Sequence, residues 1–145
     1  MLAFNKARAK FYPYNEVYLE APKKAINLPE GTPTKHQYVR LDSYVPNKEI
    51  VSRKYTQLSE VSEETAIRYL KELSDKYAPG SVIADVPSNK TGLNKGIFDV
   101  NGDNVLRGKM ILEVPVQKKL VPESILKYAR EKKIQIRDIN GNVYK

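Results

Sequence analysis

The segment 37-QYVRLDSYVPNKEIVSRKYTQL-58 carries the pattern that decides the fold. The side chains of its first half alternate between two faces, as a β-strand requires, with Tyr38, Arg40 and Asp42 opposite Val39, Leu41 and Ser43. A Pro-Asn-Lys turn follows at residues 46–48, because proline fixes φ and asparagine tolerates the left-handed region. The segment therefore predicts two β-strands joined by a tight turn.

The second strand of this hairpin, expected to run to residue 58, has polar side chains on both faces. Ser52 and Lys54 share one face, and Arg53 and Gln57 share the other. A small domain would normally bury one face of such a hairpin in its core, so these polar positions are the first candidates for function.

The rest of the chain predicts further helices and strands around the hairpin. Ser62 followed by two glutamates indicates the start of a helix, and the Asn-Gly at 140–141 is a strong hairpin signal. The expected elements are helices at 2–11, 62–77 and from Pro122, strands at 16–21, 81–86, 105–116, 134–139 and 143–144, and a long loop at 87–104. We therefore predict one α+β domain over residues 1–145, with a central mixed sheet and flanking helices.

Composition narrows the function classes. The chain has 145 residues, no cysteine and one histidine, which excludes disulfides, zinc–thiolate sites and sites built on two histidines. It has no apolar run long enough to span a membrane, and we expect no membrane partner. The formal net charge is +8, and residues 1–58 carry ten Lys and Arg against five Asp and Glu. Such a basic surface predicts a polyanionic partner, most commonly nucleic acid, although many domains are basic for solubility alone.

The order helix, three strands, helix, strand over residues 2–86 resembles the core of the restriction-endonuclease-like, or PD-(D/E)xK, nucleases. The resemblance implies a Mg²⁺ (or Mn²⁺) ion, with Asp42 as the first acid and metal ligand and Lys54 as the cation that stabilises the transition state. Ser52 stands where the family has its second acid. Glu49 is then the expected second catalytic carboxylate and metal ligand, with Glu16 and Glu20 as alternatives. Gln57, at a position that is often polar in these enzymes, is a further expected catalytic residue.

Other residues extend or oppose this prediction. The expected substrate-binding residues are Arg40, Ser52, Arg53, Lys90 and Lys95. An ordinary interpretation is that Asp42 and the basic residues of the hairpin form cross-strand ion pairs. An alternative catalyst is His36, as the base of a metal-independent ribonuclease assisted by Lys or Arg. Glu113 lies within an apolar strand and needs a partner, so it is either salt-bridged or catalytic.

A broader resemblance covers residues 37–145. The phrases RLDSY, SRKYTQLSEVSEETAIRYLKEL, ILEVPVQ and IRDINGNVYK resemble the C-terminal toxin modules of bacterial polymorphic toxins of the Rhs/YD-repeat, contact-dependent-inhibition or LXG type. This implies a nuclease toxin that cleaves tRNA, rRNA or DNA in competitor bacteria. It also implies delivery on a larger secreted or cell-surface protein, action in the target-cell cytoplasm, and a cognate acidic immunity protein. The alternative from another class is a non-enzymatic module that binds nucleic acid or protein.

Overall fold

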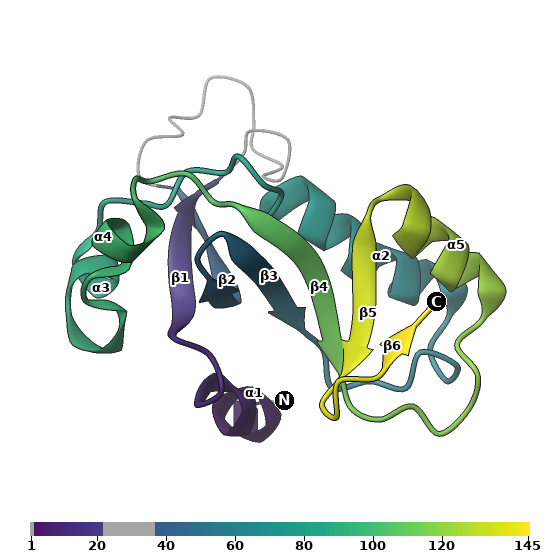
Figure 1. Cartoon of the computed structure of the whole chain (residues 1–145). Helices are drawn as coiled ribbons and strands as arrows, with labels where there is room; N and C mark the ends of the chain where they lie inside the picture. Colours follow the sequence, from purple (N-terminus) through teal and green to yellow (C-terminus); the bar gives the residue numbers. More distant parts are fainter. Residues whose placement is uncertain (1, 22–36) are drawn as a thin grey trace.

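A six-stranded mixed sheet forms the centre of the protein, with the strands side by side in chain order (Figure 1). The computed structural model describes residues 2–21 and 37–145. Strands β1 to β3 are antiparallel, β4 and β5 run parallel to β3, and β6 is antiparallel to β5. Their bounds are β1 (Tyr14–Glu20), β2 (Tyr38–Val45), β3 (Lys48–Arg53), β4 (Gly108–Val114), β5 (Ile134–Asp138) and β6 (Val143–Tyr144). The predicted α+β domain with a mixed sheet is confirmed.

Two helices, α2 (Glu63–Lys76) and α5 (Glu123–Glu131), cover one face of the sheet (Figure 1). The predicted cap of α2 is present, because the Ser62 hydroxyl accepts a hydrogen bond from the Thr65 N–H at 3.1 Å. The alternate residues of β4 that face these helices are apolar and join the main core, namely Met110, Leu112 and Val114. The intervening Glu113 points to the opposite face.

Helix α1 (Leu2–Ala9) packs on that opposite face, where its side chains contact residues of β2, β3 and β4. It is shorter than predicted and is followed by a turn in which the Phe11 and Tyr12 N–H groups bond to the Arg8 and Ala9 carbonyls. That turn brings Tyr12 over the sheet. No helix in the described part of the chain combines the length and apolar character needed to cross a bilayer.

The prediction that residues 81–86 form a strand of the sheet is wrong. This segment forms only isolated bridges, at Val82 and Ile83. The parallel neighbour of β3 is β4, so the order helix, three strands, helix, strand is completed by residues 108–114. The physical reason is that β4 is buried along most of its length, as a strand between two parallel neighbours must be.

The expected loop at 87–104 instead contains three short helices, α3 (Pro87–Lys90), η2 (Gly92–Asn94) and α4 (Ile97–Asn101), which lie beyond the edge of β1 (Figure 1). Buried asparagines fasten this segment to the strand. Asn89 accepts a hydrogen bond from the Tyr18 N–H and donates one to the Tyr18 carbonyl, and Asn94 does the same to Asn15. Two side-chain amides thus replace a neighbouring strand at the free edge of the sheet.

Two backbone positions bring β3 into register. Asn47 adopts φ 64° in the two-residue turn between β2 and β3, as its residue type predicted. Gly108 begins β4 opposite Lys48, and a Cβ atom there would lie 2.7 Å from the Lys48 carbonyl carbon. A glycine is therefore required for β4 to start directly beside the hairpin turn.

The hydrogen bonds of Asn89 and Asn94 to β1, which we call the asparagine clamp, give a prediction on stability. Asn89→Ala leaves the Tyr18 N–H without its acceptor and removes one of two donors from the Tyr18 and Ala84 carbonyls, and we expect a loss of about 1–3 kcal/mol in the free energy of unfolding. Urea denaturation measures this loss. The matched control is Asn104→Ala at an exposed position, which should change stability by less than about 0.5 kcal/mol. Equal effects of the two substitutions would show that the clamp contributes nothing.

Candidate functional site

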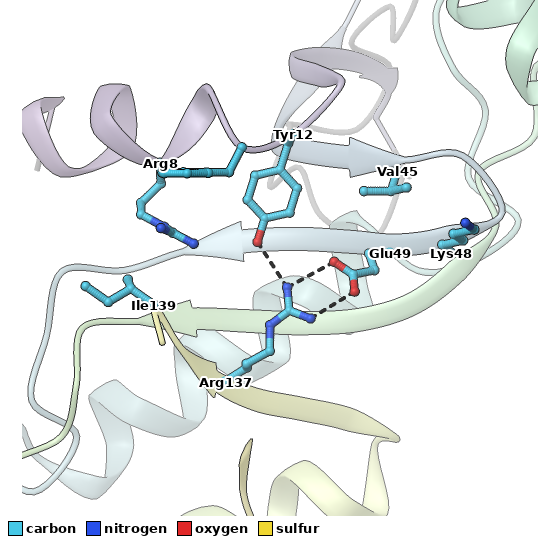
Figure 2. Close-up of a pocket in the computed structure, with 8 residues that line it drawn as sticks. Arg8, Tyr12, Val45, Lys48, Glu49, Arg137 and Ile139 are labelled. Carbon is cyan, nitrogen blue, oxygen red and sulfur yellow. Dashed lines mark hydrogen bonds and ion pairs between the residues drawn. The ribbon is translucent and has the colours of Figure 1, made fainter. Parts of the chain in front are cut away.

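An open cavity of about 510 Å³ lies between the turn after α1, the start of β3 and the end of β5 (Figure 2). We call it the arginine groove. Its lining holds three cations, one carboxylate and one phenol, and consists of Arg8, Phe11, Tyr12, Val45, Lys48, Glu49, Arg137 and Ile139. Residues that are far apart in the sequence thus meet at one hollow with a positive balance.

Glu49 and Arg137 form the centre of the groove. The two guanidinium Nη atoms of Arg137 donate to the two carboxylate oxygens of Glu49, at 2.8 and 2.9 Å, in a bidentate pair. These hydrogen bonds lower the pKa of Glu49, against the opposing effect of partial burial, and the charges of Arg137 and Lys48 lower it further. Glu49 is therefore an ionised carboxylate that faces the groove.

The Tyr12 hydroxyl joins this pair to a second group of charges. It accepts a hydrogen bond from Arg137 Nη2 at 3.0 Å and donates one to the carboxylate of Glu113 (Figure 2 shows the Arg137 contact). Burial raises the pKa of the Tyr12 phenol, and the neighbouring Glu113 carboxylate raises it further. Tyr12 is thus a neutral hydrogen-bonding bridge between the groove and the interior.

Glu113 is fully buried, at 0% exposed, and holds the inner end of this network. One carboxylate oxygen accepts from Arg8 Nε at 2.7 Å and from Arg53 Nε at 3.1 Å, and the other accepts from Tyr12. In the register of the sheet, Glu113 lies between Arg53 on β3 and Arg137 on β5. The prediction that Glu113 needs a partner is confirmed, and the partners are two arginines and a tyrosine.

Arg53 is almost as buried as Glu113, with 2% of its surface exposed. Its remaining guanidinium nitrogens donate to Asn5 and Ser43, and its guanidinium carbon lies 5.1 Å from the centre of the Tyr12 ring. Every direction of the side chain is therefore occupied by protein. Arg53 and the adjacent buried Ser52, both expected to bind substrate, have no open surface for that role in this structure.

Asp42 lies at the point where β2 and β3 separate. The two strands pair only as far as Ser43 and Val51, and beyond that point Asp42 Oδ2 accepts the Arg53 N–H at 2.7 Å. Its other oxygen accepts from Asn5 at 3.4 Å. Burial raises the pKa of the Asp42 carboxyl, opposed by the Arg53 N–H and by the charges of Arg53 and Lys54. The Asp42 carboxylate therefore accepts a β3 hydrogen bond at the point where the backbone pairing of β2 and β3 ends.

Lys54 lies near enough to Asp42 for its charge to lower the pKa of that carboxyl. Its ammonium group lies 3.3 Å from Glu72 and 5.2 Å from the ring centre of Tyr69, both on α2. The charge of Glu72 raises the pKa of Asp42. Glu72, which the sequence reasoning did not single out, is therefore the second carboxylate near Asp42.

Glu49 does not fill that position. It opposes Val45 in the sheet register, three residues along β2 from Asp42, which corresponds to roughly 10 Å of strand. Metal-bound oxygens lie about 2.0–2.1 Å from Mg²⁺, so the predicted pair Asp42 and Glu49 does not fit a shared ion. Within residues 2–21 and 37–145, no cluster of three or more His, Cys, Asp or Glu side chains could hold a metal.

The remaining predicted residues lie apart from the groove. Gln57 links the segment after β3 to the segment after β4, since its amide donates to the Val116 carbonyl and accepts from the Lys118 N–H, both at 2.9 Å. Lys90 pairs with Asp85 at 2.5 Å, and exposed Lys95 lies nearby in the segment beyond β1. Arg40 is paired with Glu16 at 3.8 Å on the surface. His36 falls outside the described residues.

Sequence reasoning missed Arg8, Tyr12 and Arg137, which make up most of the groove with Glu49. Only a weak signal pointed to Arg137, which is a polar residue in a short strand whose neighbours Ile134, Ile136 and Asp138 are buried. No local pattern tells that Arg137 meets Glu49, 88 positions earlier in the chain.

Comparisons of the chain with protein-family models, with curated proteins and with solved structures find no match. They identify neither a toxin module nor a nuclease. What the protein does must therefore be inferred from the groove itself.

The groove combines cations that can bind an anion with a carboxylate, Glu49, that can act as a base. Arginine and lysine side chains bind phosphate oxygens, and an ionised carboxylate can accept a proton. Among the described residues, the Nη atoms of Arg8 and the Nζ atom of Lys48 have no hydrogen-bond partner, so both keep donors for a ligand. Arg8 and Lys48 lie at opposite ends of the groove, with Glu49 between them (Figure 2), so each can offer donors to a different phosphate of a bound strand.

The buried network gives a prediction on stability. Glu113→Gln keeps the shape of the side chain but leaves Arg53 without its countercharge in the interior. We expect a loss of about 3–5 kcal/mol in the free energy of unfolding. The control is Glu123→Gln, which removes the exposed pair with Arg130 and should cost less than about 1 kcal/mol. Chemical denaturation compares the two, and a similar small loss in both would contradict the buried network as a stabilising element.

Proposed function

We propose that the chain is a nuclease module that cleaves RNA at the arginine groove without a metal ion. The observation that carries the proposal is the meeting of Glu49, an ionised carboxylate, with Arg8, Lys48 and Arg137 in one open cavity of about 510 Å³. Cleavage of RNA by its own 2′-hydroxyl requires a base, an acid and a cation near the phosphate. The groove offers all three.

In the proposed reaction, Glu49 accepts the proton of the ribose 2′-hydroxyl. The 2′-oxygen then bonds to phosphorus, the bond from phosphorus to the 5′-oxygen breaks, and the leaving oxygen takes a proton from the Lys48 ammonium. The products are a 2′,3′-cyclic phosphate and a free 5′-hydroxyl. Arg8 and Arg137 stabilise the extra negative charge on the phosphate oxygens in the transition state.

The bidentate pair of Glu49 and Arg137 adds a consequence for the reaction. In the free protein, Arg137 holds the Glu49 carboxylate at a low pKa, where it is a weak base. A bound phosphate competes for the same guanidinium, and each hydrogen bond that Arg137 transfers to the phosphate makes Glu49 more basic. The substrate would therefore activate the base.

Magnesium-dependent cleavage around Asp42 is the second candidate, and it has one observation in its favour. Lys54 and Glu72 both lie near enough to Asp42 to affect its pKa. Mg²⁺ is commonly held by one or two carboxylates together with substrate phosphates, and Asp42 and Glu72 would be those carboxylates. Against it, Asp42 already accepts the Arg53 N–H, and Glu72 is paired with Lys54 and Lys76.

The biological setting follows from the resemblance of residues 37–145 to polymorphic toxin modules and from the net charge of +8. The module would be delivered into a competing bacterium on a larger protein and would attack tRNA or rRNA there. An acidic immunity protein would neutralise it in the producing cell, since a negative surface can cover the cations of the groove.

A test of the proposal is cleavage of a single-stranded RNA in EDTA. We expect activity in wild type and a loss of about 10²–10⁴-fold in kcat for Glu49→Gln, because the base is removed. The control is Glu16→Gln, which removes an exposed carboxylate paired with Arg40 and should leave kcat unchanged. Dependence on Mg²⁺, with full activity in Glu49→Gln, would instead support the Asp42 site. Salt-dependent binding without turnover would leave a binding module.

The pH dependence of the rate tests the role of Arg137. The profile of kcat/KM reports the free enzyme, in which the pKa of Glu49 is lowered, so its acidic limb should lie below the ordinary glutamate value of about 4.3. The profile of kcat reports the complex, and its acidic limb should lie at higher pH because the phosphate has taken donors from Arg137. Arg137→Lys, which cannot make the bidentate pair, should bring the two limbs together. Coincident limbs in wild type would contradict activation by substrate.

A further inference from the structure

An exposed aromatic ring stands at the rim of the arginine groove. Phe11 is 63% exposed and lines the cavity. Its backbone N–H bonds to the Arg8 carbonyl at 3.0 Å, so the turn that ends α1 fixes the backbone from which the ring projects. A single exposed apolar side chain is ordinary on a protein surface, and what distinguishes Phe11 is its place on the lining of a cavity that holds three cations.

Two cations lie close to this ring, which is still largely exposed. The guanidinium carbon of Arg8 lies 4.7 Å from its centre, and the Lys10 ammonium nitrogen lies 5.3 Å from it. Arg8 also lines the groove, so one side chain is shared between the ring and the proposed phosphate site. An aromatic platform next to phosphate-binding cations is the combination by which proteins hold single-stranded nucleic acids.

Stacking on Phe11 requires a base that is free of a partner strand. In a duplex both faces of a base are covered by its neighbours, whereas an unpaired base can turn out of the strand and stack on a side chain. The ring therefore selects among nucleic acids by strandedness, while the cations of the groove do not, because a phosphate carries the same charge in both forms.

We infer that Phe11 is the base-binding subsite of the arginine groove, and that the ligand is an unpaired segment of RNA with one base stacked on Phe11 and an adjacent phosphate held by Arg8. This inference rests on the proposed function and adds to it the form of the substrate: a loop or a single strand rather than a helix. Phe11 acts in positioning and not in the chemical step.

The experiment uses a short RNA with 2′-O-methyl riboses, which has no 2′-hydroxyl and is not cleaved by the proposed reaction, and which carries one 2-aminopurine. Its fluorescence falls when the base stacks on a ring. In wild type we expect quenching on binding of the single strand. Phe11→Ala should abolish the quenching and weaken single-strand binding by roughly 5- to 150-fold, the range seen when a stacking aromatic is removed. Binding of the same RNA annealed to its complement should be unchanged.

Two further variants make the result specific. Phe11→Trp keeps a stacking surface and should bind the single strand as tightly as wild type. Tyr55→Ala removes a ring that is equally exposed, at 64%, but does not line the groove, and it should behave as wild type. Unfolding midpoints confirm that each variant is folded.

The inference is overturned if Phe11→Ala binds the single strand as wild type does, if it loses single-strand and duplex binding equally, or if Tyr55→Ala shows the same loss. It also fails if wild type binds neither form. Failure of the proposed function looks different: stacking on Phe11 without cleavage of ordinary RNA would retain the subsite and remove the catalytic role of Glu49. Cleavage of ordinary RNA, together with unaltered single-strand binding by Phe11→Ala, would retain the catalytic role of Glu49 and remove the subsite at Phe11.

Discussion

The buried carboxylate of Glu113 is the constraint on which the rest of the site depends. A charge in the interior of a central strand is tolerated only with partners, and here the partners come from three other parts of the chain: Arg8 in α1, Tyr12 in the following turn, and Arg53 in β3. Because α1 is fastened to the sheet by these contacts, Tyr12 lies where its hydroxyl also meets Arg137. The geometry of the open groove is thus set from inside the protein.

The polar residues of the β2–β3 hairpin divide into two groups with different roles. Asp42, Ser43 and Arg53 have structural roles. Their hydrogen bonds link β2 to β3 where the two strands separate, and they hold α1 on the sheet. Glu49 and Lys48, at the turn end of the same hairpin, face the groove. The unusual polarity of this segment therefore has a structural cause over most of its length, and what is left for ligand chemistry lies at its turn.

Local signals predicted the local structure. Alternation gave the strands of the hairpin, Asn47 gave its turn, and Ser62 gave the start of α2, because each depends on residues close in the chain. The errors concern long-range choices. Segment 81–86 has the composition of a strand, but β4 took the place beside β3. The pattern around Asn89 and Asn94 predicts only a loop, since the β1 residues to which they bond lie about 70 to 80 positions away. The pair of Glu49 and Arg137 was missed for the same reason.

The central claim is that the groove cleaves RNA through the ribose 2′-hydroxyl with Glu49 as the base, and the chemistry of the new ends tests it most directly. An RNA oligonucleotide is incubated with the protein in EDTA, and the fragments are identified by mass spectrometry. The account predicts fragments ending in 2′,3′-cyclic phosphate with matching 5′-hydroxyl ends. Fragments with 3′-hydroxyl and 5′-phosphate ends that form only when Mg²⁺ is added would contradict it.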